Sequence, residues 1–404
     1  MRLLHTSDWH LGRSFHDVGL LSAQAEFLDH LVDAVRSESV DAVLVSGDVY
    51  DRALPAPDTV ALLSDTMSRI IDAGAQVVLS SGNHDSAIRL GFASQLLARA
   101  GLHIRTSVAD IDRPVQVGDV CIYPLPYLEP SLVADPLGAK ERSHAGVLAA
   151  AMDRVRRAHS ARPGAAVLMA HAFATGAQPT DSERDITVGG VASVPADTFV
   201  GVDYVALGHL HRAQQLTETI RYSGSPLAMS FSEAGQVKGS WMVDINPRGK
   251  VRAEFLAAPV ARPLALLRGE LADLLSDPDL AYAQSAWCRV TLTDASRPVG
   301  AMEALRGRFP HTLELLFEPP VRLGEQRSYA ARAKAATSAL TVCCDFVDHV
   351  RGGNGATDTE RALFVEALEG TRLQRSQRED EGRVDSGSEL FAAPREPDKT
   401  GDVA

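Results

Sequence analysis

The sequence predicts an α/β protein in which a parallel sheet is covered by helices on both faces. Short apolar runs at 42–45 and 77–79 have the continuous hydrophobicity of strands that are buried on both sides. Helical patterns at about 27–35 and 57–71 alternate with these runs, and Pro57 suits the first position of a helix. This alternation of strand and helix is typical of βαβ units.

A smaller α/β unit is expected after the first 260 residues. Between 220 and 256 the strand-like pieces become shorter and are separated by turns, so they extend or close the sheet system. The smaller unit begins at about 261 and ends near the prolines at 319–320. We expect its elements to be a helical run at 264–275, a strand at 287–292, a helical run at 299–308 and a strand at 313–317.

Two further helices are predicted at 340–350 and 359–368. They carry more apolar residues than a linker normally does, which leaves two interpretations open. The helices either pack back on the smaller unit or dock a partner protein. From 373 to 404 the chain is charged and poor in large apolar residues, which predicts a disordered tail.

The composition excludes several classes of protein. No apolar stretch approaches the roughly 20 residues that span a bilayer, and no signal segment opens the chain, so we expect a cytoplasmic location without membrane contact. The four cysteines have neither disulfide-framework density nor Cys-x-x-Cys spacing, which argues against a zinc finger. A net charge of −12 argues against a basic protein that coats DNA without specificity, although it does not describe a local cleft.

Five apolar runs end in polar residues of the types that bind metal ions. In parallel sheets, ligands are held just outside the carboxyl ends of the strands, so these residues are expected to meet at one rim. A mixed set of carboxylate, amide and imidazole donors suits Mn²⁺, Fe²⁺ or Zn²⁺. The seven candidate ligands are Asp8, His10, Asp48, Asn83, His171, His209 and His211.

Seven ligands are enough for two metal ions that share Asp48. One predicted set is Asp8, His10, Asp48 and His211, and the other is Asp48, Asn83, His171 and His209. Two ions about 3.5 to 4 Å apart activate a water molecule and clamp the attacking and leaving oxygens of a phosphoryl group. The predicted chemistry is therefore phosphodiester hydrolysis.

Other residues near these motifs are assigned to catalysis or substrate binding. His84 follows a ligand without being needed as one, which fits a side chain that acts on the phosphate or on the leaving oxygen. Asp51 either assists the chemistry or holds its loop. Arg13 and His16 are candidate contacts to a DNA backbone, or else belong to a solvated loop.

The ordered set of strand-end motifs resembles the calcineurin-like metallophosphoesterase superfamily. Further stretches narrow the resemblance to the nuclease subunits of bacterial SbcCD-type complexes, over roughly residues 1 to 370. These stretches are Ser7-Asp8-Trp9-His10-Leu11-Gly12, Val188-Gly189-Gly190-Val191, 204–211, Tyr222-Ser223-Gly224-Ser225-Pro226 and Leu292-Thr293-Asp294.

The resemblance implies a fold and a division of labour along the chain. The implied fold is a sandwich of two mixed sheets flanked by helices, with a small α/β cap and C-terminal helices. The nuclease domain would be 1–260, the DNA-positioning cap 261–322, and the helices that dock an ATPase 323–372, before the tail at 373–404. Archaeal relatives place a histidine at the position of Asp51, so its role does not carry over.

The resemblance also implies an activity, a cofactor and partners. The activity would be ATP-dependent exonuclease action on duplex DNA and endonuclease cutting of hairpins and single strands, in DNA repair and recombination. Two divalent ions, Mn²⁺ above all, would serve as cofactors, with no organic cofactor. The partner would be an SMC-like ATPase of the SbcC type, bound to a homodimer of this chain within a nucleoid-associated heterotetramer.

Two other functions compete with a DNA nuclease. A phosphodiesterase or phosphatase of the same superfamily, acting on small molecules or cyclic nucleotides, would use the same metals. The cap and the apolar C-terminal helices argue against it. A scaffold that binds DNA ends or an ATPase without cutting is disfavoured because no ligand position is missing.

Overall fold

The computed structural model describes residues 1–186, 193–320, 338–351 and 353–380. Side chains are described as far as residue 373, so most of the predicted tail and the motif at 188–191 lie outside the described residues. The chain forms two compact units, of which the larger comprises Met1–Arg268, Ala272–Thr291 and Ala301–Leu316. The smaller comprises Gly269–Leu271, Leu292–Gly300 and the chain from Phe317.

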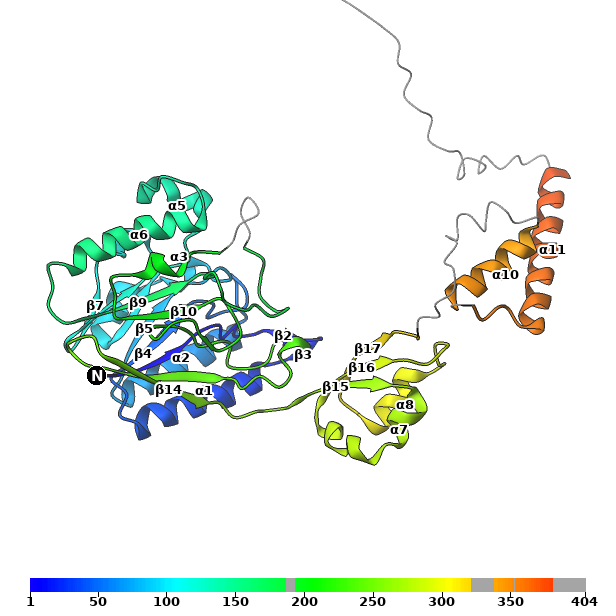
Figure 1. Ribbon diagram of the computed structural model, residues 1–404, viewed down its shortest axis with the longest axis horizontal. Helices are drawn as coiled ribbons and strands as arrows, with labels where there is room; N and C mark the ends of the chain where they lie inside the picture. Colours follow the sequence, from blue (N-terminus) through cyan, green and yellow to red (C-terminus); the bar gives the residue numbers. More distant parts are fainter. Residues whose placement is uncertain (187–192, 321–337, 352, 381–404) are drawn as a thin grey trace, which may run out of the picture. The chain divides into compact units, whose positions relative to one another are not determined.

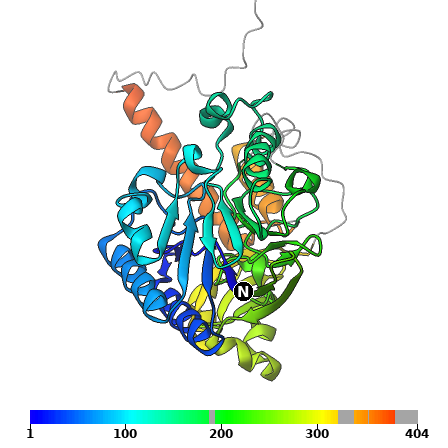
Figure 2. The same cartoon turned by 90° about the vertical axis from the view of Figure 1, so that its left-hand side faces the viewer.

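Two six-stranded sheets make up most of the larger unit (Figures 1 and 2). The first sheet has the order β14 (Val251–Ala257), β13 (Gly239–Ile245), β1 (Arg2–Thr6), β4 (Ala42–Ser46), β5 (Gln76–Ser80) and β6 (Leu102–Arg105). The second has the order β11 (Gln214–Gln215), β12 (Ile220–Tyr222), β10 (Tyr204–Gly208), β9 (Ala165–His171), β8 (Val120–Pro124) and β7 (Val115–Val117). A short hairpin joins β2 (Ser14–Phe15) to β3 (Val18–Gly19).

Helices cover the outer faces of both sheets. Helices α1 (Leu21–Ser37) and α2 (Pro57–Asp72) pack on the first sheet, and α5 (Pro130–Leu137) and α6 (His144–His159) pack on the second. The remaining short helices of this part are α3 (Ala87–Leu90), α4 (Ser94–Leu97), η1 (Ala98–Ala100), η2 (Val108–Asp110), η3 (Ala196–Phe199) and η4 (Phe231–Glu233).

A buried apolar layer lies between the two sheets. Leu3 and Leu44 of the first sheet belong to the same cluster as Val167 and Met169 of the second, and all four side chains are fully buried. Each such side chain contributes roughly 1.5 to 3 kcal/mol by leaving water. The predicted class is confirmed: the fold is a sandwich of two mixed sheets with helices on its outer faces and further helices at the C-terminal end.

Strand direction places the carboxyl ends of several strands at one rim. Strands β1, β4 and β5 run parallel to one another, and so do β8, β9 and β10. Strands β4 and β10 also contact each other across the sandwich. The chain segments that leave these strands therefore emerge side by side.

A three-stranded sheet follows the sandwich in sequence. Its strands are β15 (Leu264–Gly269), β16 (Trp287–Leu292) and β17 (Thr312–Phe317), and it carries α7 (Leu271–Ser276), η5 (Pro278–Ser285) and α8 (Ala301–Arg308). The predicted helical run at 264–275 is wrong in its first half, which is β15. Burial alternates along this strand, with Ala265 and Leu267 buried. The prediction failed because so short an apolar run fits a helix or a strand equally well.

Two helices end the described chain, α10 (Ala339–Val350) and α11 (Asp358–Asp380). They contact each other, and the Arg351 guanidinium makes a two-pronged ion pair with the Glu360 carboxylate at 2.7 and 3.0 Å. Among the described helices, none is long and apolar enough to cross a membrane. The domain boundaries expected from the sequence stay a prediction.

Candidate metal centre

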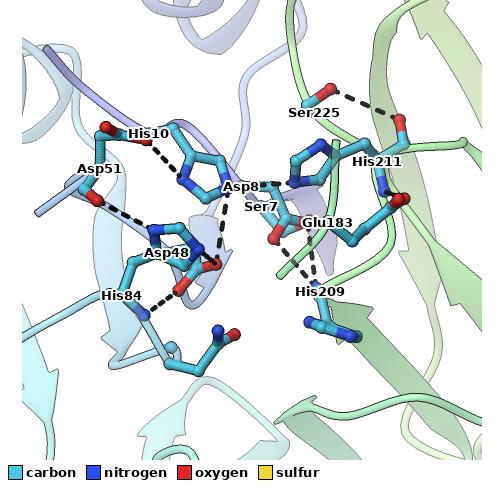
Figure 3. A network of polar contacts seen from close by, with 12 residues as sticks. Ser7, Asp8, His10, Asp48, Asp51, His84, Glu183, His209, His211 and Ser225 are labelled. Atoms are coloured by element: carbon cyan, nitrogen blue, oxygen red, sulfur yellow. Dashed lines mark hydrogen bonds and ion pairs between the residues drawn. The ribbon is translucent and has the colours of Figure 1, made fainter. Parts of the chain in front are cut away.

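Five of the seven predicted ligands, Asp8, His10, Asp48, His209 and His211, lie together in Figure 3, and short contacts join His171 and Asn83 to Asp48 at the same rim of the sandwich. The first sheet presents Asp8 and His10 after β1, Asp48 after β4 and Asn83 after β5. From the second sheet come His171 at the end of β9, and His209 and His211 after β10.

One cluster joins residues of both sheets around His10. The ligand atoms of Asp8, His10 and His211 lie within 4.8 Å of one another. The Nε2 atoms of His10 and His211 face each other at 3.0 Å, and both side chains are buried. His10 Nε2 also lies 3.5 Å from Asp48 Oδ2. These are the four residues of the first predicted set.

A second cluster joins the two sheets around His171. Asp8, Asp48 and His171 have ligand atoms within 4.8 Å of one another. His171 Nε2 lies 3.4 Å from Asp48 Oδ2 and 2.8 Å from Asn83 Oδ1. The ring of His209 is less close, with its centroid 5.3 Å from that of His171. The structure thus brings Asn83 and His171 together and leaves His209 at the margin, while Asp8 takes part in both clusters.

The backbone of the loops is strained where it turns the ligands inward. Asp8, His10, Asp48 and His209 all have positive φ angles, which are rare for residues with a side chain and concentrate at functional sites. Glycine is required at Gly82, because a Cβ atom there would lie 2.1 Å from Asp48 Oδ1 and 2.3 Å from the Asp48 nitrogen. The loops after β4 and β5 can approach this closely only without that side chain.

Asp85 anchors the two loops of the first sheet to each other. Its carboxylate accepts hydrogen bonds from the backbone N–H groups of Val49 at 3.1 Å, Tyr50 at 3.0 Å and Gly82 at 2.9 Å. Charged acceptors make the stronger hydrogen bonds in proteins. Asp85 therefore fixes the position of Asp48 relative to Asn83 without facing the metal clusters.

The protonation states of four ligands suit metal binding, whereas the raised pKa of His171 means that a cation must displace its proton. Burial raises the pKa of Asp48, but the histidines around it, His171 foremost, outweigh burial and hold that pKa well below its usual range. Burial lowers the pKa values of His10 and His211, and it lowers that of His209 to about 3. Neutral imidazole is the form that binds metals, so three histidines are ready at neutral pH.

The residues present fit a bound cation. The carbonyl of Ser46 accepts from His171 Nδ1 at 3.0 Å, which directs Nε2 of His171 at Asp48 and Asn83. The Nε2 atoms of His10 and His211, 3.0 Å apart, are close enough for one cation to bind both. Imidazoles that face each other in a buried site beside carboxylates are explained by a shared cation.

His84 takes part in a third cluster, because its ligand atom lies within 4.8 Å of those of His10 and Asp48, whereas Asp51 lies beside the clusters. His84 Nδ1 donates to the backbone carbonyl of Asp51 at 2.9 Å, and its Nε2 lies 4.0 Å from Asp48 Oδ2. The Asp51 carboxylate instead lies 3.5 Å from His10 Nδ1 and 3.6 Å from the Arg13 guanidinium. His84 is partly exposed, so its free nitrogen is open to a ligand at the rim.

Arg13 and His16 are held by contacts within the protein. Arg13 donates to the carbonyl of Ser182 at 3.0 Å in addition to its contact with Asp51. His16 lies 3.8 Å from the Glu314 carboxylate of β17. Their roles as DNA contacts stay predictions.

Several supporting residues had no assigned role in the sequence analysis. They are Asp85, Ser182, Glu183, Glu233 and Lys238. Asp85 comes two residues after the predicted ligand Asn83, and this position was its signal in the sequence. The other four follow no apolar run and have no spacing that points to a metal.

A comparison with known protein families identifies the family of this chain. The calcineurin-like phosphoesterase family matches residues 1–213, which is more than half of the chain. The chain belongs to this family. All seven predicted ligands lie within the matched residues, and the calcineurin-like phosphoesterases are metal-dependent enzymes that hydrolyse phosphoesters.

Two solved structures show weak similarity to the chain. One is described as GAP50, the anchor in the inner membrane complex of Plasmodium, with 9% identity over 80% of this chain and 99% of that chain, at a TM-score of 0.34. The other is a β-glucosidase from Exiguobacterium marinum, with 9% identity over 78% and 89% and a TM-score of 0.20. TM-scores this low carry no argument about fold or function.

Proposed function

We propose that this calcineurin-like phosphoesterase is a two-metal DNA nuclease of the SbcD type. The observation that carries the two-metal assignment is the position of Asp48 Oδ2, which lies 3.5 Å from His10 Nε2 and 3.4 Å from His171 Nε2. One carboxylate oxygen between two imidazoles that belong to different clusters is suited to bridge two ions. Divalent ions at this place supply Lewis-acid activation of water and of the phosphoryl oxygens.

Asp48 and the histidines hold the reaction centre, and His84 acts on the substrate. Because the Asp51 carbonyl binds Nδ1 of His84, Nε2 is kept in one orientation. From there the imidazolium form, which carries a hydrogen on each ring nitrogen, can donate a hydrogen bond to a phosphoryl oxygen or a proton to the leaving oxygen. Asp51 thus orients His84 through its backbone, and its carboxylate supports His10.

DNA is proposed as the substrate because the chain has further motifs and a cap in addition to the metal centre. Motifs beyond the strand ends are similar to those of SbcD-type nucleases, and an α/β cap follows the sandwich. The runner-up is a phosphodiesterase for small molecules or cyclic nucleotides, which would share the metal centre. The expected activities are ATP-dependent exonuclease cutting of duplexes and endonuclease cutting of hairpins and single strands, with Mn²⁺.

The C-terminal helices are proposed to dock an SMC-like ATPase of the SbcC type. Helices α10 and α11 contain no buried residue among their described side chains. Phe346, Val350 and Leu363 are more than half exposed. Apolar helix faces of this kind are suited to a partner helix.

A homodimer of this chain is proposed to form through an apolar groove beside α2. The groove has a volume of about 620 Å³ and is lined by residues that include Leu54, Val60, Leu63 and Phe92. Leu54 and Phe92 are 69% and 81% exposed, which is unfavourable unless a second surface covers them.

The test is cleavage of end-labelled hairpin and linear duplex DNA by the purified protein with Mn²⁺, with and without SbcC and ATP. Asp48→Ala should reduce cutting by at least about a thousandfold, because it removes the shared ligand. Asp33→Ala, which changes an exposed aspartate of α1, is the matched control and should cut normally. His84→Ala should keep both ions and lose about 10² to 10⁴-fold in rate.

The possible outcomes separate the competing functions. Turnover of a cyclic nucleotide without any DNA cleavage would establish the small-molecule enzyme instead. Full cellular function of Asp48→Ala would favour the scaffold. Loss of a metal ion from His84→Ala would make His84 a ligand, because its ligand atom also lies within 4.8 Å of those of His10 and Asp48.

A further inference from the structure

His211 is held at three of its own atoms by side chains from other parts of the chain. Its backbone N–H donates to Glu183 Oε1 at 2.7 Å, and its carbonyl accepts from Lys238 Nζ at 2.7 Å. Its ring Nδ1 lies 2.5 Å from Ser182 Oγ. The remaining ring nitrogen, Nε2, is the atom that faces His10.

A buried ion pair lies behind these contacts. Glu233 and Lys238 are 1% and 8% exposed, and the Lys238 ammonium donates to Glu233 Oε2 at 2.5 Å. The other carboxylate oxygen, Oε1, accepts from Ser182 Oγ at 2.6 Å, and Oε2 accepts also from the Met229 N–H. Burying two charges costs several kcal/mol each before their attraction is counted, so this pair is weak evidence for stability alone.

The pair reaches His211 from two directions. Lys238 binds its backbone carbonyl directly, and Glu233 reaches its ring through Ser182. Lys238 is also 3.2 Å from Ser225 Oγ, whose backbone N–H donates to the same carbonyl of His211. The backbone carbonyl and the ring of His211 are thus both held by the ion pair of Glu233 and Lys238.

The hydrogen-bond directions decide which ring nitrogen carries the proton. Ser182 has one hydroxyl hydrogen, and it can go to Glu233 Oε1 at 2.6 Å, to Thr180 Oγ1 at 3.0 Å or to His211 Nδ1 at 2.5 Å. The carboxylate is charged and has no hydrogen to donate, so it takes the hydrogen of Ser182. Ser182 Oγ must then accept from His211, which places the proton on Nδ1 and leaves the lone pair on Nε2.

We propose that Ser182, Glu233 and Lys238 are positioning residues that fix the tautomer and ring orientation of His211 for metal binding. This inference rests on the proposed two-metal function. The other buried histidine ligand with a settled direction, His171, uses a backbone carbonyl for the same purpose. Partners behind a metal-binding imidazole orient it, and their loss commonly costs 10 to 100-fold in metal affinity.

The experiment combines Mn²⁺ titration by calorimetry with ¹⁵N spectra of the histidine rings in the full-length protein. In the metal-free wild type the spectra should show the Nδ1–H form of His211. Ser182→Ala and Glu233→Gln should each weaken one of the two Mn²⁺ sites by 10 to 100-fold and should change the tautomer population of His211. Ser182→Thr keeps the hydroxyl and should restore both readouts.

Ser160→Ala is the matched control, because it removes an exposed hydroxyl that bonds only the carbonyl of Arg157 at a helix end. Unchanged Mn²⁺ affinity together with an unchanged His211 tautomer in Ser182→Ala and Glu233→Gln would overturn the positioning role. A wild type that binds no Mn²⁺ would instead defeat the proposed function, and the tautomer would still decide the positioning role. If Glu233→Gln does not fold, Ser182→Ala alone decides the test, because Ser182 is only half-buried and its replacement should not prevent folding.

Discussion

The two halves of the metal centre are built in different ways. The first sheet holds Asp8, His10 and Asp48 largely through strained turns and backbone bonds such as His10 N–H to the Asp48 carbonyl at 2.9 Å, with the Asp85 carboxylate as an anchor. On the second sheet, His211 instead depends on the Ser182, Glu233 and Lys238 network.

The difference shows two ways of making a ligand rigid. In the first half the support comes mostly from backbone groups of neighbouring strand-end loops and from Asp85, which lies 36 positions from Val49. In the second half the support comes from residues that lie 20 to 30 positions away in sequence from His211. The first half should therefore be sensitive to changes in backbone packing, and the second to distant polar substitutions.

The largest expected effect is on stability, from Asp85→Ala. The change leaves the N–H groups of Val49 and Gly82 without acceptors in buried positions, at about 1 to 3 kcal/mol each. The free energy of unfolding in denaturant should fall by about 2 to 6 kcal/mol. Asp85→Asn keeps one carbonyl acceptor and should lose less. A loss below 1 kcal/mol in Asp85→Ala would show that Asp85 does not support the first half.

Metal removal should loosen both halves together. At a metal concentration about a thousand times the Kd, binding stabilises the folded state by about 4 kcal/mol, and a chelator removes this. The thermal midpoint should fall on chelation in the wild type and stay constant in Asp48→Ala. Hydrogen exchange should rise in the loops after β5 and after β10. A rise in only one loop would mean that the ions belong to one half.

Gly82→Ala tests the close approach in the first half. The new Cβ would meet Asp48 at 2.1 Å, so the loop must move and Mn²⁺ affinity should fall by at least about tenfold. Gly307→Ala is the control, because nothing lies within 4 Å of a Cβ atom there. Its calorimetric titration should match the wild type. Equal Mn²⁺ affinities for Gly82→Ala and Gly307→Ala would show that the close approach at Gly82 is not needed for metal binding.

The smallest expected effect is the pH dependence of metal binding. Burial lowers the pKa of His171, but the carboxylates of Asp48 and Asp8 outweigh burial and raise it to about 9. In the unfolded chain the pKa of a histidine is about 6.5. Protonation of His171 therefore stabilises the metal-free fold fully below about pH 6.5, and this stabilisation is lost as the pH rises through about 9. Because a cation must displace that proton, Mn²⁺ affinity should rise by up to about tenfold per pH unit towards pH 9.

Calorimetry in buffers with different ionisation heats measures the protons released on Mn²⁺ binding. Between pH 7 and 8, one proton per His171 should appear on top of any released by other ligands. His171→Asn removes the titrating group and should release one proton fewer. The same proton count in both proteins would contradict the raised pKa.

Much of the fold and of the candidate site was predictable because its signals are local. The apolar runs of β4 and β5 and the polar residues directly after them are short-range patterns, and the parallel sheet brings them together. Strand β15 was missed because four apolar residues in a row fit either period. Glu233 and Lys238 were missed because their contact with His211 is created by the fold and leaves no pattern in the sequence.

One hydrogen bond joins the start of the chain to its middle. The backbone N–H of His209 donates to Asp8 Oδ1 at 2.9 Å across 201 positions of sequence. A chain that has paired only β1, β4 and β5 possesses Asp8, Asp48 and Asn83, yet lacks every imidazole of the second sheet. Contacts so distant in sequence form late in folding. Completion of the sandwich is therefore a precondition for the chemistry, and an unfinished molecule is an inactive one.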